Sequence, residues 1–378
     1  MQPDTDISAS SRFYLPELDG LRFFAFLAVF LSHVAVFSNG ANEAKPAIIQ
    51  IFSLIGRFGV DLFFALSAYL LTVLMIREKD KFGSLDVRAF YMRRLLRIWP
   101  LYFTWIGALM LTRHFWSDFS IGFFVPWIFF AGNFQASVLA LNTINSLIIL
   151  PLWSLSVEEQ FYLIWPLLVR NLTRRGLIVA GAVIWILTGC ARFELLLHGF
   201  TPHQIWFTGF ARLGSMAAAI LLAASMWRPI HWDRRIFFVF GLLCWAEAGT
   251  CHLLLSRPEG FAAPMWGFSI AAIGSVSFLI AAIGVKPGNL LTIRPLVYLG
   301  RISYGLYVFH GAGLVLAMHI VPASSNAIFW PLFSIVAFSL TLAASAASYR
   351  WLESGFLRRK KRYEVIRTAP IFKTTMAA

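Results

Sequence analysis

Long apolar stretches recur along the whole chain, and each is about long enough to cross the hydrocarbon core of a bilayer. Because backbone polar groups find no water there, only helices and closed barrels can span a membrane. Charged residues make up only 13% of the chain, against about 25% in a soluble domain. These features predict an all-α, polytopic bundle of transmembrane helices. The eleven candidate stretches lie near residues 21–39, 57–77, 97–112, 119–138, 152–169, 177–191, 205–227, 236–255, 265–285, 297–319 and 328–351.

Lysine and arginine residues between these stretches predict the orientation of the chain, because short cytoplasmic loops are enriched in both. Seven of them lie between the second and third stretches, which places the N-terminus in the cytoplasm. Four later basic clusters fall on the same side only if one stretch between Arg113 and Glu158 does not cross. We therefore expect about ten spans, two cytoplasmic termini, and a re-entrant or outer-face segment at 119–150, where proline, glycine and asparagine interrupt the apolar run.

The segment 83–97 mixes apolar residues with four arginines, which predicts an amphipathic helix on the cytoplasmic face before the third span. The chain then divides into a polar cytoplasmic N-terminus (1–15), a membrane domain (16–355) and a basic cytoplasmic tail (356–378). The formal net charge of +14 comes mostly from residues that flank apolar runs, so we expect no nucleic-acid partner. The three cysteines lack the spacing of a zinc site, and no metal is expected.

Arg22 and His33 place ionisable groups in the first apolar stretch, which opens with Asp19. They are eleven residues apart, so a helix places both on one face, about 16 Å apart along its axis. Ionisable residues within a span are costly and mark functional sites. A buried neutral imidazole is a usual general base for a hydroxyl. The alternative is a packing histidine, which the arginine on the same face disfavours.

A second group lies in YMRRLLRIWP at 91–100. Arg94 and Arg97 are i, i+3 neighbours on a helix, so their guanidinium groups can converge where membrane meets cytoplasm. Converging guanidinium groups suit bidentate capture of phosphates. Binding of lipid headgroups is the alternative interpretation of this pair.

A third group lies in PLWSLSVEEQFYLIWP at 151–166, where Glu158 and Glu159 interrupt an otherwise insertable segment. Two carboxylates at membrane depth have no good packing explanation, because each is costly unless it is protonated or paired. Glu158 and Tyr162 share one helix face. We expect a carboxylate here to pair with an arginine, a histidine or a tyrosine.

A fourth group lies in GRISYGLYVFH at 300–310. Ser303, Tyr307 and His310 fall at i, i+4 and i+7 and form one polar stripe, with Tyr304 beside it. Hydrogen bonding between helices is the alternative role, and it applies more to Ser303 and Tyr304 than to His310.

A fifth group interrupts the stretch at 58–72 with Asp61 and Ser67. Gly59 and the small residues Ser67 and Ala68 predict close contact with a neighbouring helix.

Five segments, in this order and spacing, resemble the integral-membrane acyltransferase family 3, which includes bacterial O-acetyltransferases of lipopolysaccharide, exopolysaccharide and Nod factors. The resemblance extends from about residue 15 to 355. It implies a ten-span enzyme of the bacterial inner membrane that moves an acyl group, usually acetyl, from cytoplasmic acyl-CoA to a hydroxyl of an envelope glycan or glycolipid. The segments are LDGLRFFAFLAVFLSH, GVDLFFALSAYLL, YMRRLLRIWP, WSLSVEEQFYLIWPLL and RISYGLYVFH.

The family's motifs fall on residues already singled out. Its arginine-x10-histidine motif matches Arg22 and His33, and its arginine-x2-arginine motif matches Arg94 and Arg97. Where the family commonly has Ser-Gly, this chain has Ser-Ala at 67–68. The two later motifs match Trp153, Ser154, Leu155 and Glu158, followed by Phe161 and Tyr162, and then Ser303, Tyr304, Tyr307 and His310.

These observations predict a division of roles. The predicted catalytic residues are His33 as general base, Glu158 as the group that orients the histidine or an arginine, and Tyr307 as oxyanion stabiliser. Acyl-CoA is the predicted co-substrate, and no metal is required. Its predicted phosphate ligands are Arg22, Arg94 and Arg97, and the predicted supporting residues are Asp19, Asp61, Ser67, Trp153, Ser154, Tyr162, Ser303, Tyr304 and His310.

A secondary transporter or flippase for an anionic sugar or lipid would also need arginine, histidine and glutamate within the membrane. Such proteins often consist of two related halves, and no motif here has a second copy. A lipid-modifying O-acyltransferase built around an asparagine and a distant histidine fits worse, because no asparagine lies at a comparable place. The expected partners are the bilayer and a hydroxylated acceptor. The acceptor, the acyl chain length and the membrane face of transfer stay open.

Overall fold

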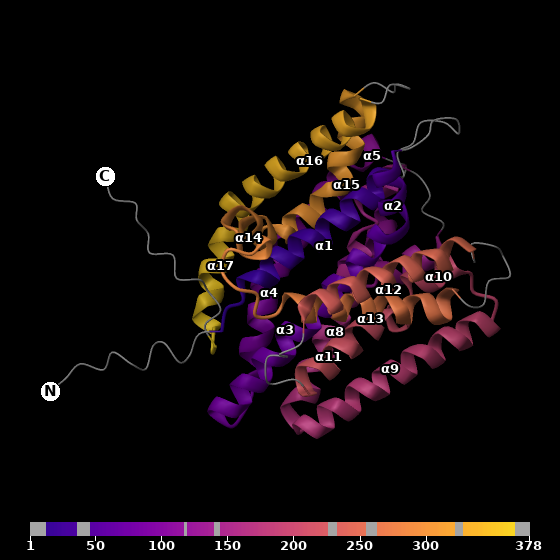
Figure 1. Ribbon diagram of the computed structural model, residues 1–378. Coiled ribbons are helices and arrows are strands. Elements are labelled where there is room, and N and C mark those ends of the chain that lie inside the picture. The colour runs from indigo at the N-terminus through magenta and orange to yellow at the C-terminus, as the bar shows by residue number, and fades with distance from the viewer. Residues whose placement is uncertain are drawn as a thin grey trace.

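The computed structural model describes residues 13–35, 46–116, 119–139, 144–225, 233–254, 263–321 and 328–366. Every secondary-structure element within these ranges is helical, as predicted (Figure 1). The α-helices are α1 (Pro16–Val34), α2 (Ala47–Ile55), α3 (Gly59–Phe82), α4 (Val87–Leu111), α5 (Arg113–Trp116), α6 (Val125–Ile128), α7 (Gly132–Val138), α8 (Leu152–Asn171), α9 (Arg174–Leu197), α10 (Pro202–Phe207), α11 (Gly214–Ser225), α12 (Arg234–Leu254), α13 (Phe268–Ala282), α14 (Arg294–Arg301), α15 (Ser303–Ile320), α16 (Phe329–Ser348) and α17 (Ser354–Lys360).

Within the described ranges, six helical segments are long and apolar enough to cross a bilayer, so the protein is a multi-pass membrane protein. The helix α4 is also long, at 25 residues, although it carries four arginines. It extends about 37 Å, more than the roughly 30 Å of a hydrocarbon core. The predicted total of ten spans stays a prediction. The six segments are Ala47–Phe82, Ser146–Asn171, Arg174–Leu197, Pro264–Ala282, Ser303–Ile320 and Phe329–Tyr363.

The segment 83–97 does not form a helix of its own. Asp86 caps the N-terminus of α4 by accepting a hydrogen bond from the backbone N–H of Ala89 at 2.8 Å. From there α4 runs without interruption to Leu111, through Pro100. From Val87 on, the stretch that the sequence predicts as an amphipathic helix before the third span is therefore the first half of α4, and its cytoplasmic location stays a prediction.

The stretch 119–150 is built from short pieces. The helices α6 and α7 have four and seven residues, and two short 3-10 turns, Ile121–Phe124 and Ile144–Ile148, lie on either side of them. Phe130, between α6 and α7, has a positive φ of 52°, which breaks the helical path. The described part of this stretch therefore contains no continuous span, and its position relative to a membrane stays a prediction.

The helix α1 lies at the centre of the bundle, with α15 and α16 on one side and α12 and α13 on the other (Figure 1). It packs directly against α2, α3, α14 and α15. Two glycines allow these approaches, because a Cβ at Gly59 would collide with the carbonyl of Ala25 and one at Gly300 with the carbonyl of Asp19. The close helix contact predicted around Gly59 is thus confirmed, and its partner is α1.

Candidate active site

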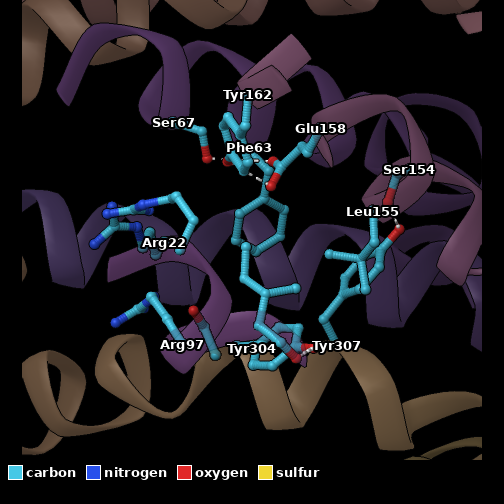
Figure 2. Close-up of a pocket in the computed structure, with 13 residues that line it drawn as sticks. Arg22, Phe63, Ser67, Arg97, Ser154, Leu155, Glu158, Tyr162, Tyr304 and Tyr307 are labelled. Atoms are coloured by element: carbon cyan, nitrogen blue, oxygen red, sulfur yellow. Dashed lines mark hydrogen bonds between the residues drawn. The ribbon is translucent and has the colours of Figure 1, made fainter. Parts of the chain in front are cut away.

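A pocket opens between α1, α3, α4, α8 and α15, and residues of all five sequence motifs line it. In Figure 2, Arg22 and Arg97 lie on one side of the pocket, Ser154 and Tyr307 on the opposite side, and Phe63 between them. We call this space the inner pocket. Its lining residues are Arg22, Phe63, Ser67, Arg94, Arg97, Ile98, Ser154, Leu155, Glu158, Tyr162, Ser303, Tyr304 and Tyr307.

The carboxylate of Glu158 is held by two hydroxyl groups. Ser67 of α3 donates to Oε1 at 3.2 Å, and Tyr162, one turn further along α8, donates to Oε2 at 2.8 Å (Figure 2). The expected partner of this carboxylate is therefore Tyr162, with Ser67 as a second donor. Neither an arginine nor His33 is hydrogen-bonded to it within the described residues, although Arg22 and Arg94 lie close enough to interact with it electrostatically.

The opposite wall carries a pair of hydroxyl groups. The Tyr307 hydroxyl lies 2.8 Å from Oγ of Ser154. Ser154 also lies 3.2 Å from the carbonyl of Pro151, to which its hydroxyl donates. Because a serine hydroxyl has a single proton, the phenol of Tyr307 is then the donor within the pair. The neighbouring Tyr304 donates instead to the carbonyl of Ile98 at 2.7 Å and so links α15 to α4.

His33 lies behind this wall rather than on it. Its Nδ1 is 3.2 Å from Nε2 of His310, and Nδ1 of His310 is 2.6 Å from the carbonyl of Tyr307. A carbonyl only accepts hydrogen bonds, so His310 carries its proton on Nδ1. With both rings neutral, His310 then accepts at Nε2 from Nδ1–H of His33. Nε2 of His33 is left with a free lone pair, which is what a general base requires.

Arg22 is held by an acidic residue three positions earlier on α1. Its Nη1 donates to Asp19 at 2.8 Å, and Tyr14 donates to the other carboxylate oxygen at 2.8 Å. Burial, and next the charge of Asp19, raise the pKa of Tyr14 to about 12, so this phenol stays protonated and keeps donating. Arg301 of α14 completes the group, because its guanidinium donates to the Tyr14 hydroxyl at 3.1 Å.

Arg94 and Arg97 are different from Arg22, since neither is engaged in a hydrogen bond or ion pair with any residue that the structure describes. Nε of Arg94 is buried and has no hydrogen-bond partner in the part of the chain that the structure describes. The rings of Phe90 and Tyr162 lie 5.9 Å from its guanidinium carbon. Two guanidinium groups that lie in one pocket wall without a hydrogen-bond or ion-pair partner among the described residues suit the binding of a multiply charged anion.

A second space, the outer pocket, adjoins the inner one. Arg22, Arg94 and Arg97 line both pockets, so the three arginines form the boundary between them. No group of three or more potential metal-ligating residues occurs in the described part of the chain. The other residues that line the outer pocket are Phe13, Tyr14, Leu15, Leu18, Asp19, Leu70, Leu74, Arg301, Tyr349, Leu357, Lys360, Lys361 and Glu364.

Three of the predicted supporting residues line neither pocket. His310 lies beside His33, behind the wall that carries Tyr307. The other two, Asp61 and Trp153, belong to the packing between helices. Asp61 is buried and paired with Arg212, which donates to it at 2.7 Å, and Ser215 donates to its other oxygen at 2.7 Å. Trp153 packs edge-on against Phe64, with ring centroids 6.1 Å apart. Both residues support the helices that carry the pocket rather than the pocket surface.

Several lining residues were not predicted from the sequence. Arg301 is the first residue of the motif RISYGLYVFH, and Tyr14 lies in the polar run before α1. No sequence pattern marked either of them as a site residue. Lys360 and Lys361 belong to a basic run that the sequence presents only as a marker of orientation. The ring pair of His33 and His310 joins residues 277 positions apart, which spacing alone could not indicate.

The chain matches a known protein family over most of its length. A family model described as an acyltransferase domain matches residues 15–350, which covers all five motifs. The chain belongs to acyltransferase family 3. Among curated proteins, this family-3 chain is 26% identical to the O-acetyltransferase OatA of Staphylococcus aureus strain MRSA252 over 96% of its own length. It is 28% identical, over 90% of its length, to YrhL of Bacillus subtilis strain 168, which is provisionally named a peptidoglycan O-acetyltransferase.

The family-3 chain is shorter than these relatives. It spans 60% of the Staphylococcus protein and 54% of the Bacillus protein. No solved structure matches it.

Proposed function

We propose that this protein is a membrane-bound O-acyltransferase that moves an acyl group, most simply acetyl, from acyl-CoA to a hydroxyl of a cell-envelope glycan or glycolipid. The observation that carries the proposal is the position of Arg22, Arg94 and Arg97 on the boundary of two adjoining pockets. Family membership supports the reaction class, and the names of both relatives support acetyl as the acyl group. The name of the Bacillus protein supports an envelope polymer as the acceptor.

Acyl-CoA fits this pair of pockets because its charge and its reactive carbon lie far apart. Its phosphates would bind Arg94 and Arg97, whose guanidinium groups have no hydrogen-bond or ion-pair partner among the described residues. Asp19 and Tyr14 hold Arg22 beside them in a fixed orientation. The pantetheine arm would then extend into the inner pocket and bring the thioester towards Ser154 and Tyr307.

His33 would act as the general base. Its Nε2, left unprotonated by the hydrogen bond to His310, accepts the proton of the acceptor hydroxyl as the oxygen attacks the thioester carbon. The phenol of Tyr307 then turns from Ser154 to donate to the oxyanion that forms. Collapse of that intermediate breaks the carbon–sulfur bond, and the CoA thiolate leaves with the proton carried by His33. A variant of this scheme with an acyl-enzyme intermediate uses the same residues.

Glu158 has a positioning role in this scheme. Ser67 and Tyr162 hold its carboxylate, and its charge lies within electrostatic reach of Arg22 and Arg94. It would therefore help to fix the two arginines at the pocket boundary, which is one of the two roles that the sequence predicts for it.

The test is acetyl-CoA binding and release of CoA thiol by the detergent-purified protein. Arg94→Ala with Arg97→Ala should weaken binding at least about a hundredfold, because each loses charge-assisted hydrogen bonds worth roughly 1.5–3 kcal/mol. Arg88→Ala is the matched control, since Arg88 lies on the same helix but is exposed and lines neither pocket. His33→Ala should keep the affinity and lose about 10² to 10⁴ in turnover.

The proposal fails if the parent protein, monodisperse and folded, binds no acetyl-CoA. It also fails if the control on α4 weakens binding as much as the double variant does. The first result would favour the transport of an anionic sugar or lipid, for which the boundary arginines would be a cargo site. The second would show that the boundary arginines have no specific role in binding.

A further inference from the structure

The segment that follows α16 closes one side of the outer pocket. The helix α17 packs against α4, and Arg93 of α4 donates from Nη1 to the carbonyl of Tyr363 at 2.6 Å. This anchor fixes the basic run 358–361 beside the pocket. The run is divided by its helical path: Lys360 and Lys361 line the outer pocket, whereas the two arginines before them are exposed and line neither pocket.

The order of charged groups along the two pockets is the first argument. The hydroxyl pair of Ser154 and Tyr307 lies in the inner pocket alone, the three arginines lie on the boundary, and Lys360 and Lys361 lie in the outer pocket alone. Lys360 lies within electrostatic reach of Arg97 and Arg94 and lines the outer pocket together with Lys361, so basic side chains continue outward from the boundary. Coenzyme A has the same order from its thiol outward: the pantetheine arm, the diphosphate, and then the ribose that carries a 3′-phosphate.

The charge of the outer pocket is the second argument. Six cationic residues and two acidic residues line it, so six minus two leaves a formal charge of +4. Coenzyme A carries roughly four negative charges at neutral pH, two on the diphosphate and up to two on the phosphate monoester. The boundary arginines alone do not match that charge, because Asp19 already neutralises Arg22. The lysines supply the remainder.

We infer that Lys360 and Lys361 bind the 3′-phosphate of coenzyme A, while Arg94 and Arg97 bind its diphosphate. The inference rests on the proposed acyl-CoA donor and extends it, because it gives the basic segment after α16 a role in recognising the nucleotide. Glu364 also lines the pocket, with its carboxylate 3.8 Å from the ammonium of Lys360. In the absence of donor this carboxylate is the counterion of the lysine, and the 3′-phosphate replaces it.

The experiment compares the dissociation constants of coenzyme A and 3′-dephospho-coenzyme A for the full chain in detergent. The parent should prefer coenzyme A by at least about tenfold, as expected for a lost charge-assisted contact to phosphate. Lys360→Ala with Lys361→Ala should abolish that preference and leave the affinity for the dephospho form unchanged. The matched control is Arg358→Ala with Arg359→Ala, which removes the same charge from the same segment and should keep the preference.

A second variant tests the counterion. Glu364→Gln keeps both lysines and removes the competing carboxylate, so it should bind coenzyme A a few-fold more tightly while its affinity for the dephospho form changes less. Equal melting temperatures of all variants establish that the fold is intact.

The outcomes separate this inference from the proposed function. If the parent binds both nucleotides and the lysine variant keeps the preference for coenzyme A, the inference is wrong and the donor assignment stands. If the lysine and arginine pairs have equal effects on both nucleotides, the segment acts as a general basic surface, such as one for lipid headgroups, and the inference is again wrong. If the folded parent binds neither nucleotide, the proposed donor is wrong and the inference with it.

Discussion

At the scale of single residues, the most informative contact is that between the two histidines. His310 is fully buried, and it has one donor nitrogen and one acceptor nitrogen, both used: it donates to the carbonyl of Tyr307 and accepts from His33. The hydrogen bond to His310 keeps the proton of His33 on Nδ1, because the partner of one ring nitrogen determines the tautomer of a histidine. His310 is therefore a positioning residue for the general base.

The prediction at this scale concerns His310. His310→Leu should lower kcat roughly ten- to hundredfold, the range typical of outer-shell partners, with little change in KM for acetyl-CoA. His310→Gln should restore much of the rate, because its amide oxygen can accept from Nδ1–H of His33. Steady-state kcat is measured for both variants. If His310 only fills space, glutamine should not restore the rate, so equal losses of kcat in the two variants would contradict the positioning role.

At the scale of elements, a buried ion pair joins α3 to the segment that leads into α11. Asp61 and Arg212 are each only 2% exposed, and the guanidinium carbon of Arg212 lies 4.3 Å from the ring centroids of both Trp206 and Phe268. Nε and Nη1 of Arg212 have no hydrogen-bond partner within the described residues. The carboxylate of Asp61 is thus the group that compensates this buried charge, and α3 carries Ser67 of the pocket on the same helix.

Removing one partner of this pair should be costly. Asp61→Asn should destabilise the protein by about 3–5 kcal/mol, because it leaves the charge of Arg212 uncompensated in a buried site. Asp61→Leu combined with Arg212→Met should recover most of that loss, since neither charge then remains. Thermal unfolding in detergent measures both. A double variant as unstable as the single one would show that the helices need the pair itself.

At the scale of the whole molecule, five helix ends meet at one end of the bundle. Lys79, near the end of α3, donates to the carbonyls of Val169 and Leu172 at the end of α8, both at 2.8 Å. Asp80 pairs with Arg174 at the start of α9. Arg93, near the start of α4, bonds to the residues that follow α17. Three of the basic segments that the sequence predicts to be cytoplasmic, 77–97, 170–175 and 358–361, therefore lie at one end. The first and last of them line the outer pocket together with Arg301.

Cysteine labelling tests the orientation of this basic end. In a background where Cys190, Cys244 and Cys251 are replaced by serine, a single cysteine is introduced by Arg359→Cys at the basic end or by Phe115→Cys beyond the far end of α4. Position 115 is 85% exposed. A membrane-impermeant maleimide should label position 115 in intact spheroplasts, and position 359 only after permeabilisation. The reverse pattern would place the arginines on the outside, away from cytoplasmic acyl-CoA.

The sequence predicted some parts of the site more fully than others. Arg22, Arg94, Arg97, Glu158 and Tyr307 were all expected at one site, because each is a polar group that a bilayer would otherwise exclude, and all five line one pocket. Asp61 is also a charged residue within an apolar stretch, but it lies elsewhere, in a buried ion pair. A charge within an apolar stretch indicates burial and does not distinguish a catalytic role from a structural one. Lys360 and Lys361 were not predicted as site residues, because basic residues that flank an apolar stretch are common at the membrane surface.

The sequence by itself determined that the protein is helical and membrane-embedded, because the cost of unpaired backbone groups in hydrocarbon depends on composition and segment length alone. It also determined which polar residues share a helix face, because that depends only on the helical period. The tertiary structure decided which faces meet. The partner of Glu158, the acceptor for His33 and the lysines beside the boundary arginines all come from helices distant in the chain, and only packing brings such groups within hydrogen-bonding or electrostatic reach.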